Sequence, residues 1–131
     1  MIALKSVSSP VEPEKDGLRI LVARFRGRGV DKGRYDLWMA SLGPSEELLE
    51  RLQSGDLGWS EFIRRYREEI FTDGDVDERN STVKNRGQKF TLRLLRELGE
   101  RQNVTLLCHC GESEQHCHRP LLQKLIEGSS A

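Results

Sequence analysis

The chain has 131 residues, a length typical of one domain with a single hydrophobic core. Its 21 basic residues balance 21 acidic residues, so the net charge provides no general attraction to nucleic acids or to anionic membranes. No stretch has the apolar length of a signal peptide or of a membrane span, which favours a cytoplasmic protein without a membrane partner.

Two strands are predicted in the first quarter of the chain. Residues 2–5 form a short apolar run, and residues 18–23 (LRILVA) have the apolar, β-branched character of a buried strand. Asp16 and Gly17 between them are typical of a turn. We therefore expect two extended segments joined by a loop rich in serine, proline and glutamate.

A basic, glycine-rich loop follows the second strand. Six basic residues and a single acid, Asp31, lie between Arg19 and Arg34. This local patch keeps a nucleic-acid partner in consideration. It contains only Phe25 and Tyr35 as aromatics, so binding to single strands by base stacking is not favoured.

Two helices are predicted next. Ser45 ahead of Glu46 and Glu47 is typical of a helix N-cap with acids near the positive end of the macrodipole, and the helix should end near Gln53. A second helix is predicted with Ser60 as its cap, because five apolar side chains recur at helical spacing. We expect all five in the core: Trp59, Phe62, Ile63, Tyr66 and Ile70.

Residues 71–88 are polar and contain two glycines, which predicts a mobile loop. Alternating aspartates in this segment suggest a calcium-binding loop of the EF-hand type. However, Glu78 stands where that loop needs glycine, and Lys84 stands where it needs a bidentate glutamate. We therefore interpret the segment as a solvated acidic loop.

The last third of the chain predicts a helix, a strand and a helix. The first helix carries an apolar stripe and should close near Gly99, residues 104–108 (VTLLC) read as a buried strand, and residues 120–127 as a final helix. The stripe consists of Phe90, Leu94, Leu95 and Leu98. Strands interleaved with helices indicate an α/β fold: a small, mostly parallel sheet flanked by helices in a single domain over residues 1–131.

All three cysteines and all three histidines lie between Cys108 and His118, directly after a predicted strand. Parallel sheets bind ligands at the carboxyl ends of their strands. Cys117 precedes His118, Arg119 and a helix, and such surroundings lower the pKa of a thiol. The resulting thiolate can attack carbon, phosphorus or sulfur. The structural alternative is that Cys117 is a small buried residue that only packs.

The start of the final helix raises a question of capping. If Pro120 is its first residue, Arg119 is a poor cap, and the backbone N–H groups of Leu121 and Leu122 need an acceptor from elsewhere. One interpretation is a bound anion. The other is a side chain that folds back from the preceding loop: Glu112, Ser113 or Glu114.

A metal or redox role competes with the thiolate. Cys108 and Cys110 should project from one side of the strand toward Cys117, with His109 on the other side. The three thiols with His116 or His118 would complete a tetrahedral zinc site, although the paired Cys-x-x-Cys arms of zinc knuckles are missing. A third alternative is a redox switch in which Cys117 forms a disulfide with Cys108 or Cys110.

At this point the sequence resembles a known family. A strand ending in Cys108, a short acidic loop and Cys117-His118-Arg119 before a last helix resemble the domain-of-unknown-function 488 family. The segments LVARFRGRGV, YDLWMASLGPS and WSEFIRRYREEI resemble its YeaO-like branch, in the same order and with comparable spacing. The resemblance covers most of the chain and is weakest over residues 71–88.

The resemblance implies an α/β fold and an enzyme whose reaction is unassigned. One departure lies in the basic loop, where Arg26 and Gly27 occupy the place of a Trp-Pro pair found in many relatives. Cys110 belongs only to some relatives, so Cys108 and Cys117 carry more weight. The positions that match the family pattern are Arg24, Arg28, Gly29, Asp36, Trp38, Ser45, Tyr66, Cys108, Cys117, His118 and Arg119.

Our leading hypothesis is an enzyme that acts on a small anionic compound, a nucleotide or a phosphorylated metabolite, and needs no cofactor. Cys117 is the nucleophile or redox thiol, with Cys108 as the other family cysteine. Arg119, Arg24 and Arg28 hold the anion together with the helix N-terminus.

In this scheme His118 or Asp36 handles a proton. Asp36 has a simpler alternative, an ion pair with a nearby arginine. Trp38 and Tyr66 are expected to pack in the core. The competing classes are a zinc-binding or redox-sensing module and a nucleic-acid-associated domain.

Overall fold

The computed structural model describes residues 1–27, 30–71, 73–74, 85–86, 88–110 and 117–128. Its centre is a sheet of four strands in the order β1-β6-β2-β3, and every pairing is parallel. The strands are β1 (Ile2–Ser6), β6 (Val104–Cys108), β2 (Leu18–Leu21) and β3 (Leu37–Trp38). The predicted α/β class and parallel sheet are confirmed.

The register places the ends of these strands together. Val104 pairs with Ile2 on one side and with Leu18 on the other, so β1, β6 and β2 begin level and run in the same direction. Their carboxyl ends therefore share one edge of the sheet. This arrangement confirms that the two strands predicted at residues 18–23 and 104–108 are neighbours.

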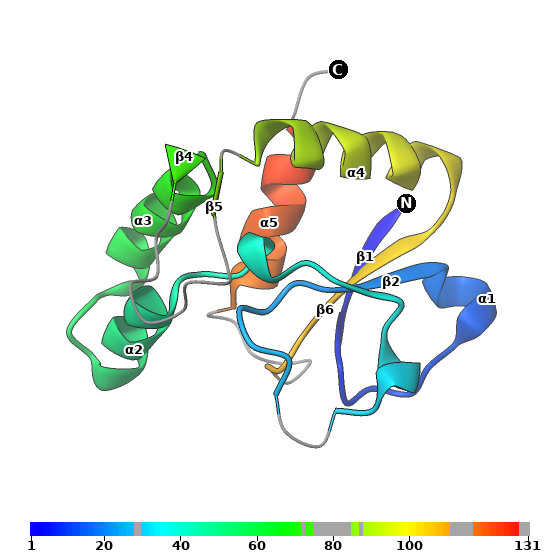
Figure 1. Cartoon of the computed structure of the whole chain (residues 1–131), viewed down its shortest axis with the longest axis horizontal. Helices are drawn as coiled ribbons and strands as arrows, with labels where there is room; N and C mark the ends of the chain where they lie inside the picture. Colours follow the sequence, from blue (N-terminus) through cyan, green and yellow to red (C-terminus); the bar gives the residue numbers. More distant parts are fainter. Residues whose placement is uncertain (28–29, 72, 75–84, 87, 111–116, 129–131) are drawn as a thin grey trace.

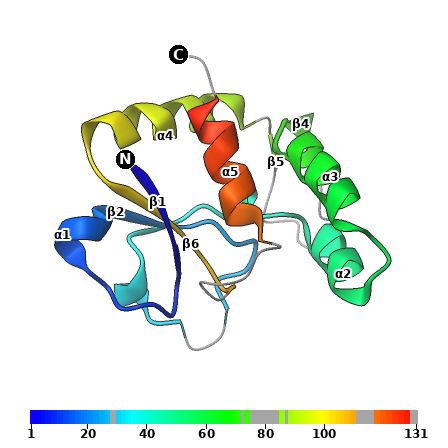
Figure 2. The same ribbon diagram turned by 180° about the vertical axis from the view of Figure 1, so that it is seen from behind.

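The helices around the sheet are α1 (Pro13–Asp16), α2 (Glu46–Ser54), α3 (Trp59–Phe71), α4 (Lys89–Arg101) and α5 (His118–Glu127), with 3-10 turns at Lys32–Arg34 and Ala40–Leu42. Both ribbon views show α2 and α3 together at one end of the molecule and α1 at the other (Figures 1 and 2). Helices α4 and α5 lie between these two ends (Figures 1 and 2). They contact each other, and both contact β6.

The two faces of the sheet are covered differently. Ile20 and Val22 belong to the main core, which also contains buried side chains from α2, α3, α4 and α5. Leu21 and Ala23 point to the opposite face, where a smaller cluster is covered by partly buried Val30 and Tyr35 of the loop after β2. Alternation along β2 thus divides the core in two.

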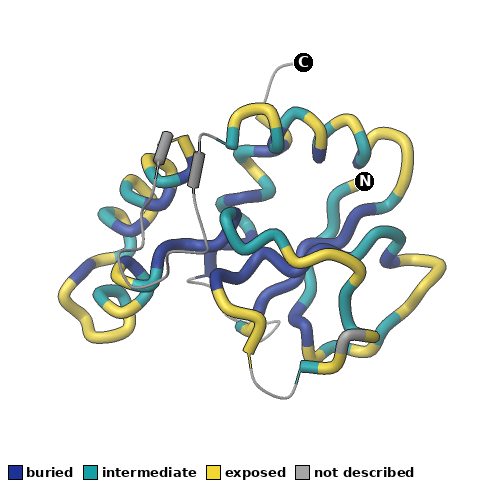
Figure 3. The backbone as a smooth tube through the Cα atoms, in the orientation of Figure 1, coloured by how far each residue is buried: buried dark blue, intermediate teal, exposed yellow. Residues whose placement is uncertain are grey.

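β6 is the most deeply placed strand. All five of its residues are buried, which agrees with a central position between β1 and β2 (Figure 3). Its one polar side chain inside the strand, Thr105, donates its hydroxyl hydrogen to the carbonyl of Asp16 at 2.8 Å. The continuous apolar run VTLLC reflects this burial on both faces.

Of the two predicted serine caps, one is confirmed and the other is wrong. Ser45 caps α2 as predicted, because its hydroxyl oxygen accepts a hydrogen bond from the backbone N–H of Leu48 at 3.2 Å. The predicted cap at Ser60 is wrong. Helix α3 already includes Trp59, and the N–H of Phe62 donates to the carbonyl of Gly58 at 3.0 Å, so Ser60 lies inside the first turn.

The apolar stripes were assigned partly to the wrong side chains. In α3, Phe62, Tyr66 and Ile70 are buried as predicted, whereas Ile63 is 36 % exposed. In α4, the predicted core residues Phe90 and Leu94 are 71 % and 57 % exposed. Leu95 of the predicted stripe is buried, and so is Leu92, which the stripe did not include. Helix α4 also continues past Gly99 to Arg101, and a Cβ at Gly99 would meet Cδ1 of Ile2 at 2.7 Å.

The segment predicted as a polar loop contains paired backbone at its two ends. β4 (Asp73–Gly74) and β5 (Asn85–Arg86) form a short antiparallel ladder. Residues 75–84 between them lie outside the described residues. The interpretation of this segment as an acidic loop rather than a calcium-binding loop therefore stays a prediction. Among the described residues, no helix combines the length and the apolarity needed to cross a bilayer.

Candidate functional site

The carboxyl edge of the sheet holds a cluster of sulfur atoms. β6 ends at Cys108, whose carbonyl accepts a hydrogen bond from the N–H of Val7 at 2.8 Å. On the other side the N–H of Val22 donates to the carbonyl of Leu107 at 2.8 Å. The ladder thus continues to the last residue of the strand, which holds the Cys108 side chain rigidly at this edge.

Three thiols converge here. The Sγ atoms of Cys108, Cys110 and Cys117 all lie within 4.8 Å of one another, and those of Cys108 and Cys117 are 3.2 Å apart. The backbone N–H of Cys110 donates to Sγ of Cys108 at 3.4 Å. The prediction that Cys108 and Cys110 face Cys117 is confirmed. His109 is directed away, with its Nε2 at 2.8 Å from the carbonyl oxygen of Phe25.

Helix α5 begins two residues earlier than predicted. Its first residue is His118 and its N-cap is Cys117, in extended backbone conformation with φ −124° and ψ 148°. Arg119 is therefore not the cap, and Leu121 and Leu122 are not its first residues. Proline needs no N–H partner within the first turn, so Pro120 fits as the third residue. The sulfur of Cys117 consequently lies at the positive end of the helix macrodipole.

Arg119 faces the same sulfur. Its Nε donates to Sγ of Cys117 at 3.3 Å, and its side chain is buried. Burial alone lowers the pKa of Arg119, but the negative charge of the cysteine cluster outweighs it, so the pKa is raised and the guanidinium stays charged. A buried cation next to a thiol is the pairing that stabilises a thiolate.

The pKa values of the sulfur pair move in opposite directions. The pKa of Cys117 is lowered, chiefly by hydrogen bonds from Cys108 and Cys110, against the opposing effect of burial, with a further contribution from His118. The pKa of Cys108 is raised by its hydrogen bonds with Cys110 and Cys117 and by burial. These opposite directions favour a hydrogen bond in which the thiol of Cys108 donates to the sulfur of Cys117.

His118 joins the start of α5 to the sheet. Its Nε2 lies 2.6 Å from the carbonyl oxygen of Val22, and its ring meets the edge of Tyr66 at a centroid distance of 5.7 Å. Because a carbonyl only accepts, Nε2 carries the hydrogen. Tyr66 is buried as predicted and donates its hydroxyl hydrogen to the carbonyl of Leu42 at 2.6 Å.

Comparison with known proteins adds one finding to this geometry. The family model described as the active DUF488-N3 subclade matches residues 2–130. The chain belongs to the DUF488 family. The match is compatible with the YeaO-like branch and spans both halves of the cysteine cluster. The curated proteins contain no match. The solved structures likewise contain none.

In this DUF488 protein the predicted anion-binding arginines have different surroundings. Arg119 lies with the thiols, whereas Arg24 is 1 % exposed and donates to the backbone carbonyls of Gly43 at 2.9 Å and Pro44 at 3.2 Å. Arg24 thus supports the turn before α2. Arg28, the third predicted residue, lies outside the described residues.

Asp36 lies away from the cysteine cluster. Its Oδ1 is 3.0 Å from Nη2 of Arg19, and its Oδ2 accepts from the backbone N–H of Arg19 at 2.9 Å. Hydrogen bonds and charge from Arg19 lower the pKa of Asp36. Arg19 pairs with Thr105, three positions before Cys108 along β6. The ion pair considered as the alternative is the contact observed.

The prediction that Trp38 packs in the core is wrong. Its side chain is 43 % exposed because β3 is a two-residue strand at the edge of the sheet. The indole N–H donates to the carbonyl of Ala23 at 2.8 Å. This contact fixes the ring across the end of β2 without burying it.

The basic loop of this DUF488 protein presents less free charge than its composition suggests. Arg19 pairs with Asp36, Arg24 is buried, and Nη1 of Arg34 donates to the carbonyl of Ser9 at 3.0 Å. These contacts give the nucleic-acid alternative little support. Sequence reasoning missed the bond from Arg24 to residues 43 and 44, because no local pattern signals an arginine that caps a distant turn.

Proposed function

We propose that this DUF488 protein is an enzyme in which the Cys117 thiolate attacks a small anionic substrate, with Cys108 as the neighbouring proton donor. The observation that carries the proposal is the pair of contacts to Sγ of Cys117: Sγ of Cys108 at 3.2 Å and Nε of Arg119 at 3.3 Å. One hydrogen-bond donor and one cation thus meet a sulfur at a helix N-cap.

The substrate class follows from charge. As the sulfur of Cys117 forms a bond to the substrate, the bond to the leaving group breaks and the leaving group takes the proton of Cys108. The groups that stabilise the thiolate are placed to stabilise the anion that develops in this step. These groups are the Arg119 guanidinium and the positive end of α5. A nucleotide or a phosphorylated metabolite fits such a site, and its chemistry needs no cofactor.

Access to the sulfur is the main requirement of this proposal. The expectation that Cys117 is open to solution is wrong, because it is only 2 % exposed. Its contacts nevertheless include a thiol and a guanidinium, which a residue that only packs does not need. Cys110 is partly exposed and lies beside the pair, so it indicates the side from which a substrate approaches.

The test is the rate of iodoacetamide alkylation of each cysteine as a function of pH, followed by peptide mass spectrometry. We expect Cys117 to ionise at a lower pH than an ordinary free thiol. The variant Cys110→Ser keeps the central pair and serves as the matched control. If Cys117 ionises like a free thiol in both proteins, the proposed nucleophile is refuted.

A soft-metal site is the second candidate, favoured by the convergence of three sulfur atoms within 4.8 Å. Zinc–sulfur bonds of about 2.3 Å in a tetrahedron would hold thiolates roughly 3.8 Å apart, so small movements would close the set. A histidine would complete it, but Nε2 of His118 is occupied by the carbonyl of Val22, and His116 lies outside the described residues.

Elemental analysis of untagged protein separates the two functions. One zinc per chain that persists through dialysis would support the metal site, because a bound thiolate is not a free nucleophile. Protein free of metal that retains a low-pKa Cys117 would support the enzyme.

A further inference from the structure

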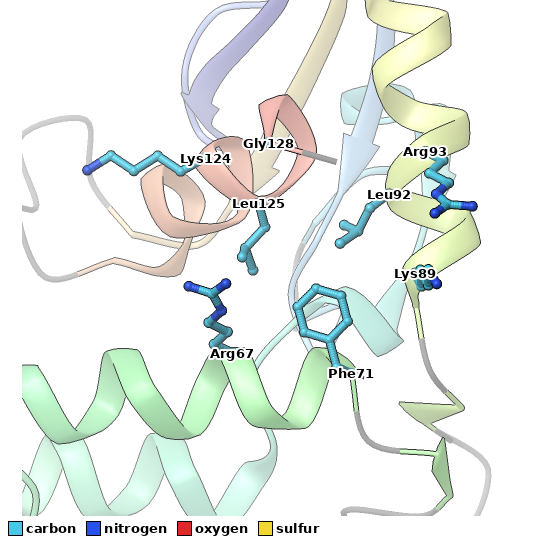
Figure 4. Close-up of a pocket in the computed structure, with 8 residues that line it drawn as sticks. All are labelled: Arg67, Phe71, Lys89, Leu92, Arg93, Lys124, Leu125 and Gly128. Carbon is cyan, nitrogen blue, oxygen red and sulfur yellow. The ribbon is translucent and has the colours of Figure 1, made fainter. Parts of the chain in front are cut away.

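A second concave site lies between α3, α4 and α5, beyond the sheet edge that carries the cysteines. It is a pocket of about 510 Å³, within the range that binds small molecules. Phe71 of α3, Leu92 of α4 and Leu125 of α5 supply its apolar lining (Figure 4). Arg67 reaches from α3 into the space beside Leu125 (Figure 4).

The charge around this pocket is all positive. The cationic residues that line it are Arg67, Lys89, Arg93 and Lys124, and none of the described lining residues is acidic. Lys89 and Arg93 lie over the ring of Phe90, with their charged groups 5.9 and 5.3 Å from its centroid. Arg67 points into the space, whereas Lys124 extends away from it (Figure 4). Lys89 and Arg93 flank the pocket from α4.

Other arginines on the same helices have acidic partners. On α3, Arg64 and Arg65 both pair with Glu61. On α4, Arg101 pairs with Glu97 at 2.9 Å. Within the described part of the chain, the four cations of the pocket have no acidic partner. Among the described residues the side-chain charge that lines the pocket is therefore positive, which favours an anionic ligand.

The N-terminus of α4 adds positive potential to the pocket, whereas α3 and α5 face it with their C-terminal turns. Helix α4 starts at Lys89, has no acidic residue in its first turn, and has no side-chain cap from Gln88. Helix α2, by contrast, begins with Glu46 and Glu47. A cation at the positive end of a helix macrodipole is unfavourable by itself, and an anion in the pocket would offset both charges.

The apolar lining of the pocket indicates which uncharged group the anionic ligand carries. Phe71 is 45 % exposed and presents a ring, whereas Leu92 is 1 % exposed and closes the floor. Phe71, Leu92 and Leu125 form an apolar surface against which an aromatic ring can pack. An aromatic group stacked on Phe71 with a phosphate held by the surrounding cations satisfies both features.

We propose that this pocket binds a nucleoside monophosphate at a site separate from the cysteine cluster. The pocket uses Lys124, Leu125 and Gly128 near the C-terminal end of α5, whereas Cys117 caps the opposite end. Seven residues of helix correspond to about 10 Å along its axis. The two sites therefore use different ends of one helix, and binding here does not require a reactive thiol.

The test is calorimetric titration of the full chain with adenosine 5′-monophosphate at low ionic strength. We expect the double variant Arg67→Gln with Arg93→Gln to weaken binding about tenfold or more, through loss of charged contacts to phosphate. The matched control is Arg64→Gln with Arg101→Gln, which removes two arginines from the same helices outside the pocket. It should change the affinity less than about twofold.

Two further probes identify the ligand chemistry. Adenosine and inorganic phosphate should each bind more weakly than adenosine 5′-monophosphate, because each lacks one half of the ligand. Phe71→Leu should lower the affinity for adenosine 5′-monophosphate but leave the affinity for inorganic phosphate unchanged. Thermal unfolding of each variant checks that it is folded.

Several outcomes would overturn the proposal. These are no heat of binding at millimolar nucleotide, equal losses in the pocket and control variants, or loss of nucleotide binding in Cys117→Ser. Binding of a single-stranded dodecamer of thymidine more than about a hundredfold tighter than the mononucleotide would reveal a nucleic-acid surface instead. Retained nucleotide binding in Cys117→Ser supports the pocket even if the proposed nucleophile fails.

Discussion

The sulfur atoms of Cys108 and Cys117 lie 3.2 Å apart, one at the end of β6 and the other at the N-cap of α5. Their separation is set by the docking of a helix start against a sheet edge rather than by the loop that connects them. The two thiols therefore titrate as a pair, in which the first proton is lost easily and the second with difficulty.

Removing the partner thiol should return Cys117 toward ordinary behaviour. In Cys108→Ala the thiolate loses its main hydrogen-bond donor, so the pKa of Cys117 should rise by about one unit or more. The alkylation rate of Cys117 measured from pH 4 to 10 gives this value directly. An unchanged profile would mean that the helix and Arg119 alone stabilise the thiolate.

Arg119→Gln should raise the pKa of Cys117 in the same direction, because the buried cation next to its sulfur is lost. We expect the pH at which the alkylation rate of Cys117 is half-maximal to move upward, because the thiolate loses its neighbouring cation. Arg26→Gln, an exposed charge change in the basic loop, is the control. Equal rates in both variants would contradict the charge pairing.

The same geometry predicts a specific disulfide. Treatment with diamide should join Cys108 to Cys117, since a movement of about 1.2 Å brings the sulfurs to bonding distance. The two thiols lose two protons and two electrons to the reagent. Peptide mapping should find the bridge in Cys110→Ser and not in Cys108→Ala. A bridge that uses Cys110 in the wild-type protein would contradict this assignment.

Arg24 should matter for folding. Arg24→Met leaves the carbonyls of Gly43 and Pro44 without their buried donor, and we expect a loss of about 3 kcal/mol in the free energy of unfolding. Urea unfolding followed by circular dichroism measures it. Arg26→Met, at an exposed neighbouring position, should change the free energy by less than about 0.5 kcal/mol. A neutral Arg24→Met would contradict the structural role.

The ion pair of Asp36 with Arg19 should make a small, pH-dependent contribution to the free energy of unfolding. The pKa of Asp36 is lowered in the folded state, so its pair with Arg19 stabilises the fold above the unfolded-state value of about 3.9. That contribution is lost as the pH falls through the lower folded-state value. Because the pair is partly exposed, Asp36→Asn should cost only about 0.5 to 1 kcal/mol at pH 7 and almost nothing at pH 2. A cost that persists at pH 2 would point to hydrogen bonding alone.

The strands and the first helix cap were predictable because their signals are local. The run VTLLC contains the whole of β6, and Ser45 followed by two glutamates marks the start of α2 without reference to any other part of the chain. The family resemblance likewise rests on short segments in order, and the match over residues 2–130 confirms it.

The exposed faces of the helices were less predictable. Phe90 and Leu92 in α4 are both apolar, yet Phe90 is 71 % exposed and Leu92 is 1 % exposed. Their burial depends on which face of α4 packs on the sheet and on α5, and helical periodicity alone permits more than one choice. The close approach of Ile2 to Gly99 selects one of them.

By itself the sequence determined the strands and the gathering of three cysteines after one of them, because these features arise from contiguous residues. The neighbourhood of β2 and β6 comes from long-range pairing and was only an assumption before the structure. Only the tertiary structure decided the partners of the charged groups: Arg119 with the Cys117 sulfur, Arg24 with a turn 20 residues away, and Asp36 with Arg19 rather than with the cysteines. The physical reason is that a charge pairs with whatever the folded chain brings within a few ångströms, and local sequence carries no record of that distance.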